Sequence, residues 1–406
     1  MTTWGQLTNE QKLEVARLHG KENKSWAELS KKYGIDIGNF STFKRKAQQL
    51  IKKDVQQVTE QSPLKDKVIA LLLQRPYTLL ELCNRFDTSP NKIQDVIEAL
   101  KNEHHPIESK DNTVELPAKP NGHTLKSIMG ESLGKICWAE MADTHNGSRY
   151  AQKSAVNSFI DTAYEKYNVR HVLHSGDATA GTNVYRGQSH ELYATSAMEQ
   201  ADDFCNSIPE KPGLDYYAIQ GNHDYSFYKS AGLDILSLIA SQRKDIIHAG
   251  CDEARISLVD GIDVMLWHPS GGVPYAVSYR GQRYVTELSG SELMDLVVGE
   301  KTSPSLRFVQ IGHLHILNLF VHGPTYVSQA GCFEGTNGYL KAKGLRPFIG
   351  GIIWTAEIST NKMVLEATPH ILNYPEIPDD YRNHRVPMTA PLMERRLDTL
   401  FSMKGE

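Results

Sequence analysis

The sequence predicts an α+β main domain with two stacked mixed β-sheets flanked by helices, preceded by all-α modules. Two observations predict this class. Between residues 134 and 222, short apolar runs alternate with helix-forming stretches, a pattern typical of β-α-β units. After residue 250 the pattern changes to pairs of apolar runs joined by turn residues, such as Asp260-Gly261 and Gly323-Pro324, which indicate hairpins. Parallel strands followed by hairpins favour mixed sheets that stack and are covered by helices.

The composition fits an ordinary globular protein of 406 residues, long enough for two or three domains. No apolar run approaches the roughly 18 residues of a membrane span, and the N-terminus lacks a signal-peptide pattern. We therefore expect a cytoplasmic protein, in the host cytoplasm if a phage encodes it, with no membrane partner. The five cysteines are scattered without a C-x-x-C pair, which predicts reduced thiols and no disulfide framework.

Residues 1–58 predict a helix-turn-helix domain that resembles the transposase or resolvase type. Three helical patterns follow one another, with a break at Gly34, and eleven Lys or Arg stand against six acids. The third helix exposes residue types that read base edges and hold phosphates. These candidate nucleic-acid-binding residues are Asn39, Ser41, Thr42, Lys44, Arg45 and Lys46. They favour nucleic acid as the partner, DNA before RNA; the alternative is a packing or dimerisation module that makes a homo-oligomer.

Residues 63–117 predict a second module that resembles a winged helix. Helices are expected from Pro63, after the cap Thr78 and from Ser89-Pro90, and a hairpin is expected across Asp111-Asn112. The outward residues of its third helix are barely basic, so this module is a weaker candidate for nucleic-acid binding. A linker follows at residues 117–122.

Five polar clusters each follow a predicted strand. Because a strand fixes its last residue while the next loop aims the side chain, such strand ends can converge on one cleft. The clusters are Asp143-Thr144-His145, Gly176-Asp177, Gly221-Asn222-His223-Asp224, Trp267-His268-Pro269 and Gly312-His313-Leu314-His315. One cluster alone could be a tight turn or a structural histidine. Together, Asp, His and Asn without Cys favour manganese, iron or zinc.

The order D-x-H, GD, GNH(D/E), H and GH-x-H resembles the calcineurin-like metallophosphoesterase family over about residues 134–370. The resemblance implies a metallophosphoesterase fold, assigned to residues 130–374, and two divalent ions: Mn²⁺ first, with Fe, Zn, Ni or Mg as alternatives. It implies that Asp143, His145 and His315 hold one ion, that Asn222, His268 and His313 hold the other, and that Asp177 bridges them. It further implies that His223 protonates the leaving oxygen and that Asp224 orients His223.

Three further features bear on the resemblance. Many family members carry an acid and an Arg after the bridging Asp, whereas residues 178–181 here are Ala-Thr-Ala-Gly, which leaves the support of the ligands open. Residues 331–335 and 341–345 resemble phage-type members described as DNA repair exonuclease-like. After His268, the candidate substrate-contacting residues are Tyr279, Arg280 and Arg283, because aromatic rings stack on bases and Arg contacts phosphates; the alternative is a hairpin of ordinary surface residues.

The function predicted from the sequence is a two-metal-dependent phosphodiesterase, a DNA nuclease that uses a metal-bound hydroxide and whose N-terminal modules bind DNA. One alternative is a phosphomonoesterase or a small or cyclic-nucleotide phosphodiesterase whose N-terminal modules mediate oligomerisation or localisation. A DNA-binding regulator with a decayed catalytic domain is the other, and the complete ligand set argues against it. Residues 375–406 are predicted to be a C-terminal tail without chemistry.

Overall fold

The computed structural model describes residues 63–119, 125, 127–130, 134–272, 276–298 and 305–383, and the backbone of 393–396. The predicted helix-turn-helix of residues 1–58, with all six candidate nucleic-acid-binding residues, lies outside the described residues. The chain divides into two compact units, residues 1–102 with 107–115 and residues 103–106 with 116–406.

The first unit contains the three helices and the hairpin predicted for residues 63–117. The helices are α4 (Leu64–Leu72), α5 (Leu79–Phe86) and α6 (Pro90–Asn102), and the strands are β1 (Tyr77–Thr78), β2 (Glu108–Lys110) and β3 (Thr113–Glu115), in the order β1-β3-β2. Thr78 and Glu81 form a reciprocal capping box that fixes the start of α5. The predicted elements of this module are therefore confirmed.

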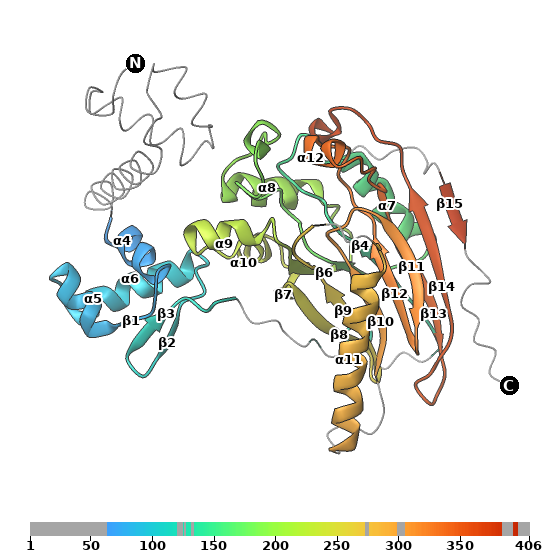
Figure 1. The fold of residues 1–406 in the computed structure, drawn as a ribbon, viewed down its shortest axis with the longest axis horizontal. Coiled ribbons are helices and arrows are strands. Elements are labelled where there is room, and N and C mark those ends of the chain that lie inside the picture. The colour runs from blue at the N-terminus through green and yellow to red at the C-terminus, as the bar shows by residue number, and fades with distance from the viewer. Residues whose placement is uncertain are drawn as a thin grey trace, which may run out of the picture. The chain divides into compact units, whose positions relative to one another are not determined.

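The second unit contains two mixed sheets (Figure 1). The seven-stranded sheet has the order β15-β14-β13-β4-β5-β6-β7 and consists of β4 (Gly134–Met141), β5 (His171–His174), β6 (Asp215–Gln220), β7 (Ile246–Cys251), β13 (Gly350–Ile358), β14 (Val364–Asn373) and β15 (Met393–Arg396). The five-stranded sheet has the order β11-β12-β10-β9-β8 and consists of β8 (Glu253–Val259), β9 (Ile262–Trp267), β10 (Leu306–Ile311), β11 (Leu317–His322) and β12 (Thr325–Ala330). Strands β4 to β7 are parallel, as are β9, β10 and β12, whereas the outer strands β8, β11, β13, β14 and β15 pair antiparallel.

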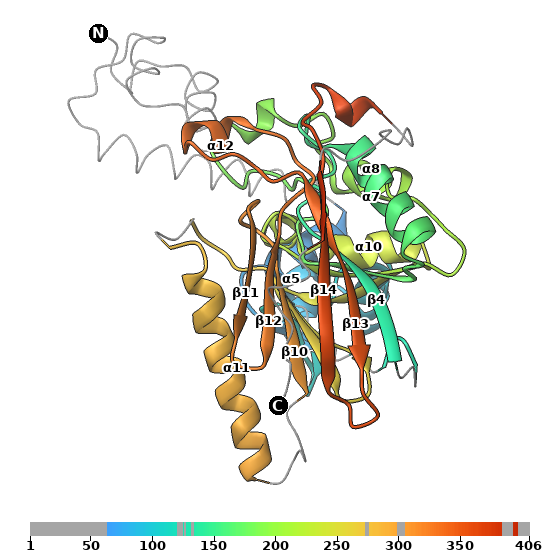
Figure 2. The same cartoon turned by 90° about the vertical axis from the view of Figure 1, so that its right-hand side faces the viewer.

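Helices cover both outer faces of the stacked sheets (Figure 2). One apolar core lies between the sheets, where Trp138, Phe308 and Trp354 are buried and the Trp138 and Phe308 ring centroids are 4.7 Å apart. A second core joins the seven-stranded sheet to α7 (Lys153–Lys166), α8 (Ala197–Ser207) and α10 (Ile235–Gln242), and a third joins the five-stranded sheet to α11 (Tyr279–Val297). The predicted stacked mixed sheets flanked by helices are confirmed. The class is better written α/β than α+β, because β4 to β7 run parallel with helices between them.

Some elements differ from the sequence-based prediction. Residues 279–297 form one helix of 19 residues, an element that the sequence did not predict; the hairpin given as the alternative for residues 279–283 is not found. The start of the predicted tail packs on the second unit: the Asp380 carboxylate accepts hydrogen bonds from the backbone N–H and the hydroxyl of Ser154, and Ile377 exchanges hydrogen bonds with the Gln152 side chain. The other described helices are α9 (Tyr225–Ala231) and α12 (Gly338–Ala342), with short 3₁₀ turns at Gln188–His190 and Asp380–Arg382.

All five cysteines are free thiols, as the sequence predicts. Among the described residues, no helix combines the length and the apolar character that a membrane crossing requires.

Candidate active site

All five polar clusters lie just beyond the carboxyl ends of parallel strands. Asp143 and His145 follow β4, Asp177 follows β5, and the Asn222-His223 pair follows β6. His268 follows β9, and His313 and His315 follow β10 of the other sheet. Because parallel strands end at the same edge and the two sheets stack, ligands from both sheets meet at this edge.

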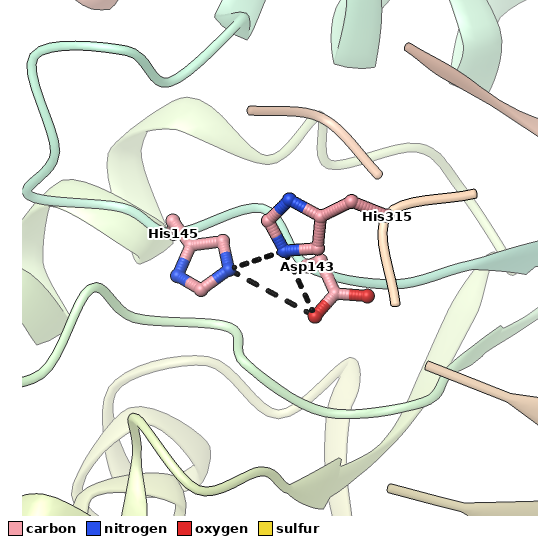
Figure 3. Close-up of side chains that lie close together, drawn as sticks. All are labelled: Asp143, His145 and His315. Atoms are coloured by element: carbon pink, nitrogen blue, oxygen red, sulfur yellow. Dashed lines mark hydrogen bonds and ion pairs between the residues drawn. The ribbon is translucent and has the colours of Figure 1, made fainter. Parts of the chain in front are cut away.

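The first group is Asp143, His145 and His315, and all three side chains are buried (Figure 3). The Nε2 atoms of the two histidines are 3.1 Å apart, and they lie 3.8 Å (His145) and 3.5 Å (His315) from Oδ1 of Asp143. That carboxylate oxygen accepts no hydrogen bond from any residue that the structure describes. Since a buried carboxylate oxygen without a donor is costly, two imidazole nitrogens and this oxygen fit a shared cation.

The second group is Asp177, His268 and His313. His268 Nε2 lies 3.2 Å from Oδ2 of Asp177 and 3.2 Å from Oδ1 of Asn222. The same Asp177 oxygen is 3.8 Å from His145 Nε2, which belongs to the first group. Asp177 therefore lies between the two groups, the position that a bridging carboxylate needs.

Backbone carbonyls set the orientation of two of these imidazoles. His268 Nδ1 lies 2.7 Å from the Ser175 carbonyl oxygen, and His313 Nε2 lies 2.6 Å from the Gly271 carbonyl oxygen. A carbonyl oxygen only accepts, so each of these nitrogens carries the proton. The other ring nitrogen of each histidine is then available as a ligand. Metal-binding histidines commonly donate their second ring N–H to a carbonyl or carboxylate in this way.

The loops that carry these side chains have an unusual backbone. Five proposed ligands have positive φ angles, between 45° and 79°: Asp143, His145, Asp177, His313 and His315. Such residues cost on the order of 1–3 kcal/mol each and cluster at functional sites. Neighbouring glycines allow close approach, because a Cβ atom at Gly221 would overlap the Asp177 carboxylate, and one at Gly312 would overlap the Ser175 carbonyl.

The electrostatics of the cluster favour cations beside the Asp177 carboxylate. Burial alone would raise the pKa of Asp177, but His268 and His223 hold this pKa well below its usual range. Burial would lower the pKa of His268, yet Asp177 raises it to about 9. Burial together with His268 lowers the pKa of His313 to about 4. Asp177 is therefore anionic in a largely buried site, and cations bound there would satisfy the charge that His268 partly offsets.

Residues 139–339 match the family model described as calcineurin-like phosphoesterase. They form a calcineurin-like metallophosphoesterase domain. The Asp and His groups described above lie in this metal-dependent phosphoesterase domain and are the groups among the described residues that could hold its metal ions.

Relatives of known name cover part of the chain. The chain is 24% identical over 240 residues to the DNA polymerase II small subunit of Halobacterium salinarum. The aligned region covers 52% of this chain and 46% of that protein. The chain thus spans about half the length of the curated relatives it matches. Among solved structures, it is similar to an archaeal phosphodiesterase (15% identity, 58% of this chain and 100% of that one, TM-score 0.30). It is also similar to Vps29 of Entamoeba histolytica in complex with zinc (12% identity, 59% and 92%, TM-score 0.32).

Within the metallophosphoesterase domain, His223 lies beside the two ligand groups. Its Nδ1 atom makes its hydrogen bond to a backbone carbonyl and not to a carboxylate. This nitrogen lies 2.6 Å from the Ala180 carbonyl oxygen, and Nε2 lies 4.0 Å from Oδ2 of Asp177. The prediction that Asp224 orients His223 is wrong. The buried Asp224 carboxylate accepts hydrogen bonds from the backbone N–H groups of residues 178, 179 and 221 and from the Thr179 hydroxyl. Its oxygens are therefore used to join the loops after β5 and β6.

The departure from the family pattern at residues 178–181 has a structural explanation. Thr179 supplies its hydroxyl and its N–H to Asp224, and Ala180 supplies the carbonyl that holds His223. The Gly181 N–H donates to the Gln200 side chain, which also donates back to the Gly181 carbonyl. This loop therefore supports the site largely through its backbone, without the usual acid and Arg.

Glu334, which lies in the segment 331–335, was not predicted as a site residue. Glu334 is buried, and its Oε2 lies 3.9 Å from His145 Nε2 and 3.9 Å from His315 Nδ1. Ser148 and Asn337 donate hydrogen bonds of 2.7 Å and 2.9 Å to its carboxylate. Burial raises the pKa of Glu334 to about 7. The signal in the sequence that could have identified Glu334 is its position, an acid just after a predicted strand, as with the other site residues.

The candidate substrate-contacting residues form part of a hollow beside His268. Tyr279, Arg280 and Arg283 lie in the first turns of α11 and line a cavity of about 630 Å³ together with Trp267 and His268. Arg280 donates a hydrogen bond of 3.0 Å to the Ser270 carbonyl. The structure thus brings these three residues close to one proposed ligand.

Proposed function

We propose that the metallophosphoesterase domain is a two-metal phosphodiesterase that cleaves nucleic acid, DNA before RNA. In this proposal Asp143, His145 and His315 hold one divalent ion, and Asn222, His268 and His313 hold the other. Asp177 bridges them. The observation that carries the proposal is the place of Asp177, whose Oδ2 lies within 4 Å of histidines from both groups.

Two divalent ions, when bound, supply a clamp for the phosphate and an activated water. The residues of the chain then do the rest. His223 is the proposed general acid, because its Nδ1 proton is committed to the Ala180 carbonyl and its Nε2 faces the site. Its side chain is 14% exposed, so a substrate oxygen can reach it.

DNA is the favoured substrate for two reasons. The relative with 24% identity is a DNA polymerase small subunit by name, which supports a DNA context without assigning an activity. The hollow at the start of α11 combines Arg280, Arg283 and the exposed Tyr279, groups that suit phosphates and bases, with the stacked pair Trp267 and Tyr284 and the acids Asp252 and Glu287. Within the described residues, Arg283 has no ion-pair partner and is available for a phosphate.

A smaller substrate is the second candidate. The cavity lined by five of the seven proposed ligands measures only about 310 Å³, near the lower end for ligand sites, which suits a phosphomonoester or a small or cyclic nucleotide. In that case the N-terminal modules serve oligomerisation or localisation.

The test is hydrolysis of labelled single-stranded DNA, double-stranded DNA, RNA and bis(p-nitrophenyl) phosphate, each with Mn²⁺ and with a chelator. We expect Mn²⁺-dependent cleavage of DNA that the chelator abolishes. Asp177→Asn should weaken binding of both ions, measured by elemental analysis, whereas Asp161→Asn, at a distant surface ion pair with Lys211, is the matched control. At most one ion per wild-type chain with metal in excess would contradict the two-metal site, and cleavage confined to monoesters or cyclic nucleotides would select the second candidate.

A further inference from the structure

The cavity that holds the proposed ligands has a second wall that metal ions and phosphate do not require. Besides the histidines it is lined by apolar and aromatic side chains, namely Val184, Tyr185, Tyr339, Leu340 and Leu345. We propose that this wall is a subsite for a single nucleobase, attached to the phosphate held at the ligand groups. The inference rests on the proposed function and names the part of the nucleotide that the cavity recognises.

Two tyrosines make the aromatic part of this wall. The ring centroids of Tyr185 and Tyr339 are 5.4 Å apart, and the Tyr185 ring is 6.1 Å from that of His223. The wall therefore begins next to the proposed acid. Tyr339 is 39% exposed, so its side chain is accessible to a ligand. Aromatic rings in such places stack with bases of any sequence.

Hydrogen bonds hold the wall in place before any ligand binds. The Glu191 carboxylate accepts a 2.5 Å hydrogen bond from the Tyr185 hydroxyl and a 2.9 Å one from the Gly338 N–H at the start of α12. Asn337 caps α12 through the Leu340 N–H and donates to Glu334 beside the histidines. Both tyrosines are thus tied to one another and to the ligand groups, and a preformed subsite loses less entropy on binding.

The segment that carries Tyr339 and Leu345 is basic, although Glu334 lines the cavity and Glu191 contacts Tyr185. Lys341, Lys343 and Arg346 are exposed and lie in the same segment as Tyr339 and Leu345, and the sequence has no acid between residues 335 and 356. A ligand with a flat apolar base and anionic phosphates matches this combination. At about 310 Å³ the cavity has room for one nucleoside beside the ligand groups and not for an oligonucleotide.

Calorimetric titration of the Mn²⁺-loaded full chain tests the subsite directly. The probes are deoxyadenosine 5′-monophosphate, deoxyadenosine 3′-monophosphate, deoxyribose 5-phosphate and inorganic phosphate. At least one deoxyadenosine monophosphate should bind at least about fivefold more tightly than deoxyribose 5-phosphate, since one stacked base contributes at least about 1 kcal/mol. Tyr339→Ala should remove that preference, Tyr339→Phe should keep it, and the affinity for inorganic phosphate should stay the same in all three proteins.

Equal affinity of the wild type for the nucleotides and for deoxyribose 5-phosphate overturns the subsite, as does a preference that survives Tyr339→Ala. Because Tyr339 is on the surface, its truncation leaves the fold intact. Failure of the proposed function has a different pattern: neither inorganic phosphate binding nor hydrolysis of bis(p-nitrophenyl) phosphate would depend on Mn²⁺. If Mn²⁺ dependence is absent but the base preference persists, the subsite proposal stands and only the proposed function fails. If the base preference is lost as well, both proposals fail.

Discussion

At the scale of single residues, the sequence predicts which side chains form the site better than it predicts which groups hydrogen-bond to them and orient them. The five clusters could be found because each ligand is an Asp, His or Asn next to a strand end. The group that fixes His223 could not, because it is the backbone carbonyl of Ala180, which any residue supplies. Asp224 was given the wrong role for the same reason, since its partners are mainly backbone N–H groups.

His223→Ala should keep both metal ions and lose turnover, because the imidazole acts on the leaving oxygen and the proposed ligands stay intact. Its deficit should shrink with a p-nitrophenyl leaving group, which needs little protonation. Metal content and kcat on a dinucleotide and on bis(p-nitrophenyl) phosphate provide the measurement. An equal loss on both substrates would remove the acid role from His223.

Asp224→Asn should lower the free energy of unfolding by about 1–3 kcal/mol, because the amide group turns a donor toward backbone N–H groups that now donate to a carboxylate. Since this residue joins two loops, activity should fall alike on good and poor leaving groups. Thermal denaturation and the two-substrate comparison measure both effects, and Thr179→Ser, which keeps the hydroxyl, is the control. Selective loss on the poor leaving group would restore the original role of Asp224 as the residue that orients the acid.

At the scale of elements, strands and hairpins were predictable where apolar runs end in turn residues, as at Asp260-Gly261 between β8 and β9. Helix α11 was missed because its buried residues are Gly281, Val285 and Glu292, which make no apolar stripe. Glu292 is buried because it pairs with Arg255 of β8, a tertiary contact that the local pattern does not contain.

Arg283→Ala in α11 should weaken DNA binding and lower the slope of log affinity against log salt by about 1, as expected for one lost phosphate contact. Hydrolysis of bis(p-nitrophenyl) phosphate should not change, because this substrate does not extend into the hollow beside His268. Fluorescence anisotropy across a salt series measures the effect, and Lys244→Ala, at another exposed position of the same domain, is the matched control. The same slope for wild type and Arg283→Ala would exclude Arg283 from the DNA path.

At the scale of the whole molecule, the charge is divided between a basic head and an acidic remainder. Residues 1–58 hold eleven Lys or Arg against six acids, although the full chain has a net charge of −4. All the proposed ligands and the proposed acid lie after residue 134, in the second unit. The role of the head therefore stays a prediction that can be tested separately from the chemistry.

Deleting residues 1–60 should reduce affinity for long DNA and leave hydrolysis of bis(p-nitrophenyl) phosphate nearly unchanged. The physical reason is counterion release: each phosphate that the basic residues of the head neutralise releases counterions, so binding weakens steeply as salt rises. Anisotropy with long DNA across a salt series, hydrolysis of the small diester and the mass in solution are measured on both proteins. If the head binds DNA and brings it to the catalytic domain (delivery), the deletion should reduce binding and cleavage of long DNA alone. If the head mediates oligomerisation, the deletion should lower the mass in solution and change activity on both substrates together. Unchanged DNA affinity across the salt series would refute delivery, and the phosphodiesterase proposal would then rest on the metallophosphoesterase domain alone.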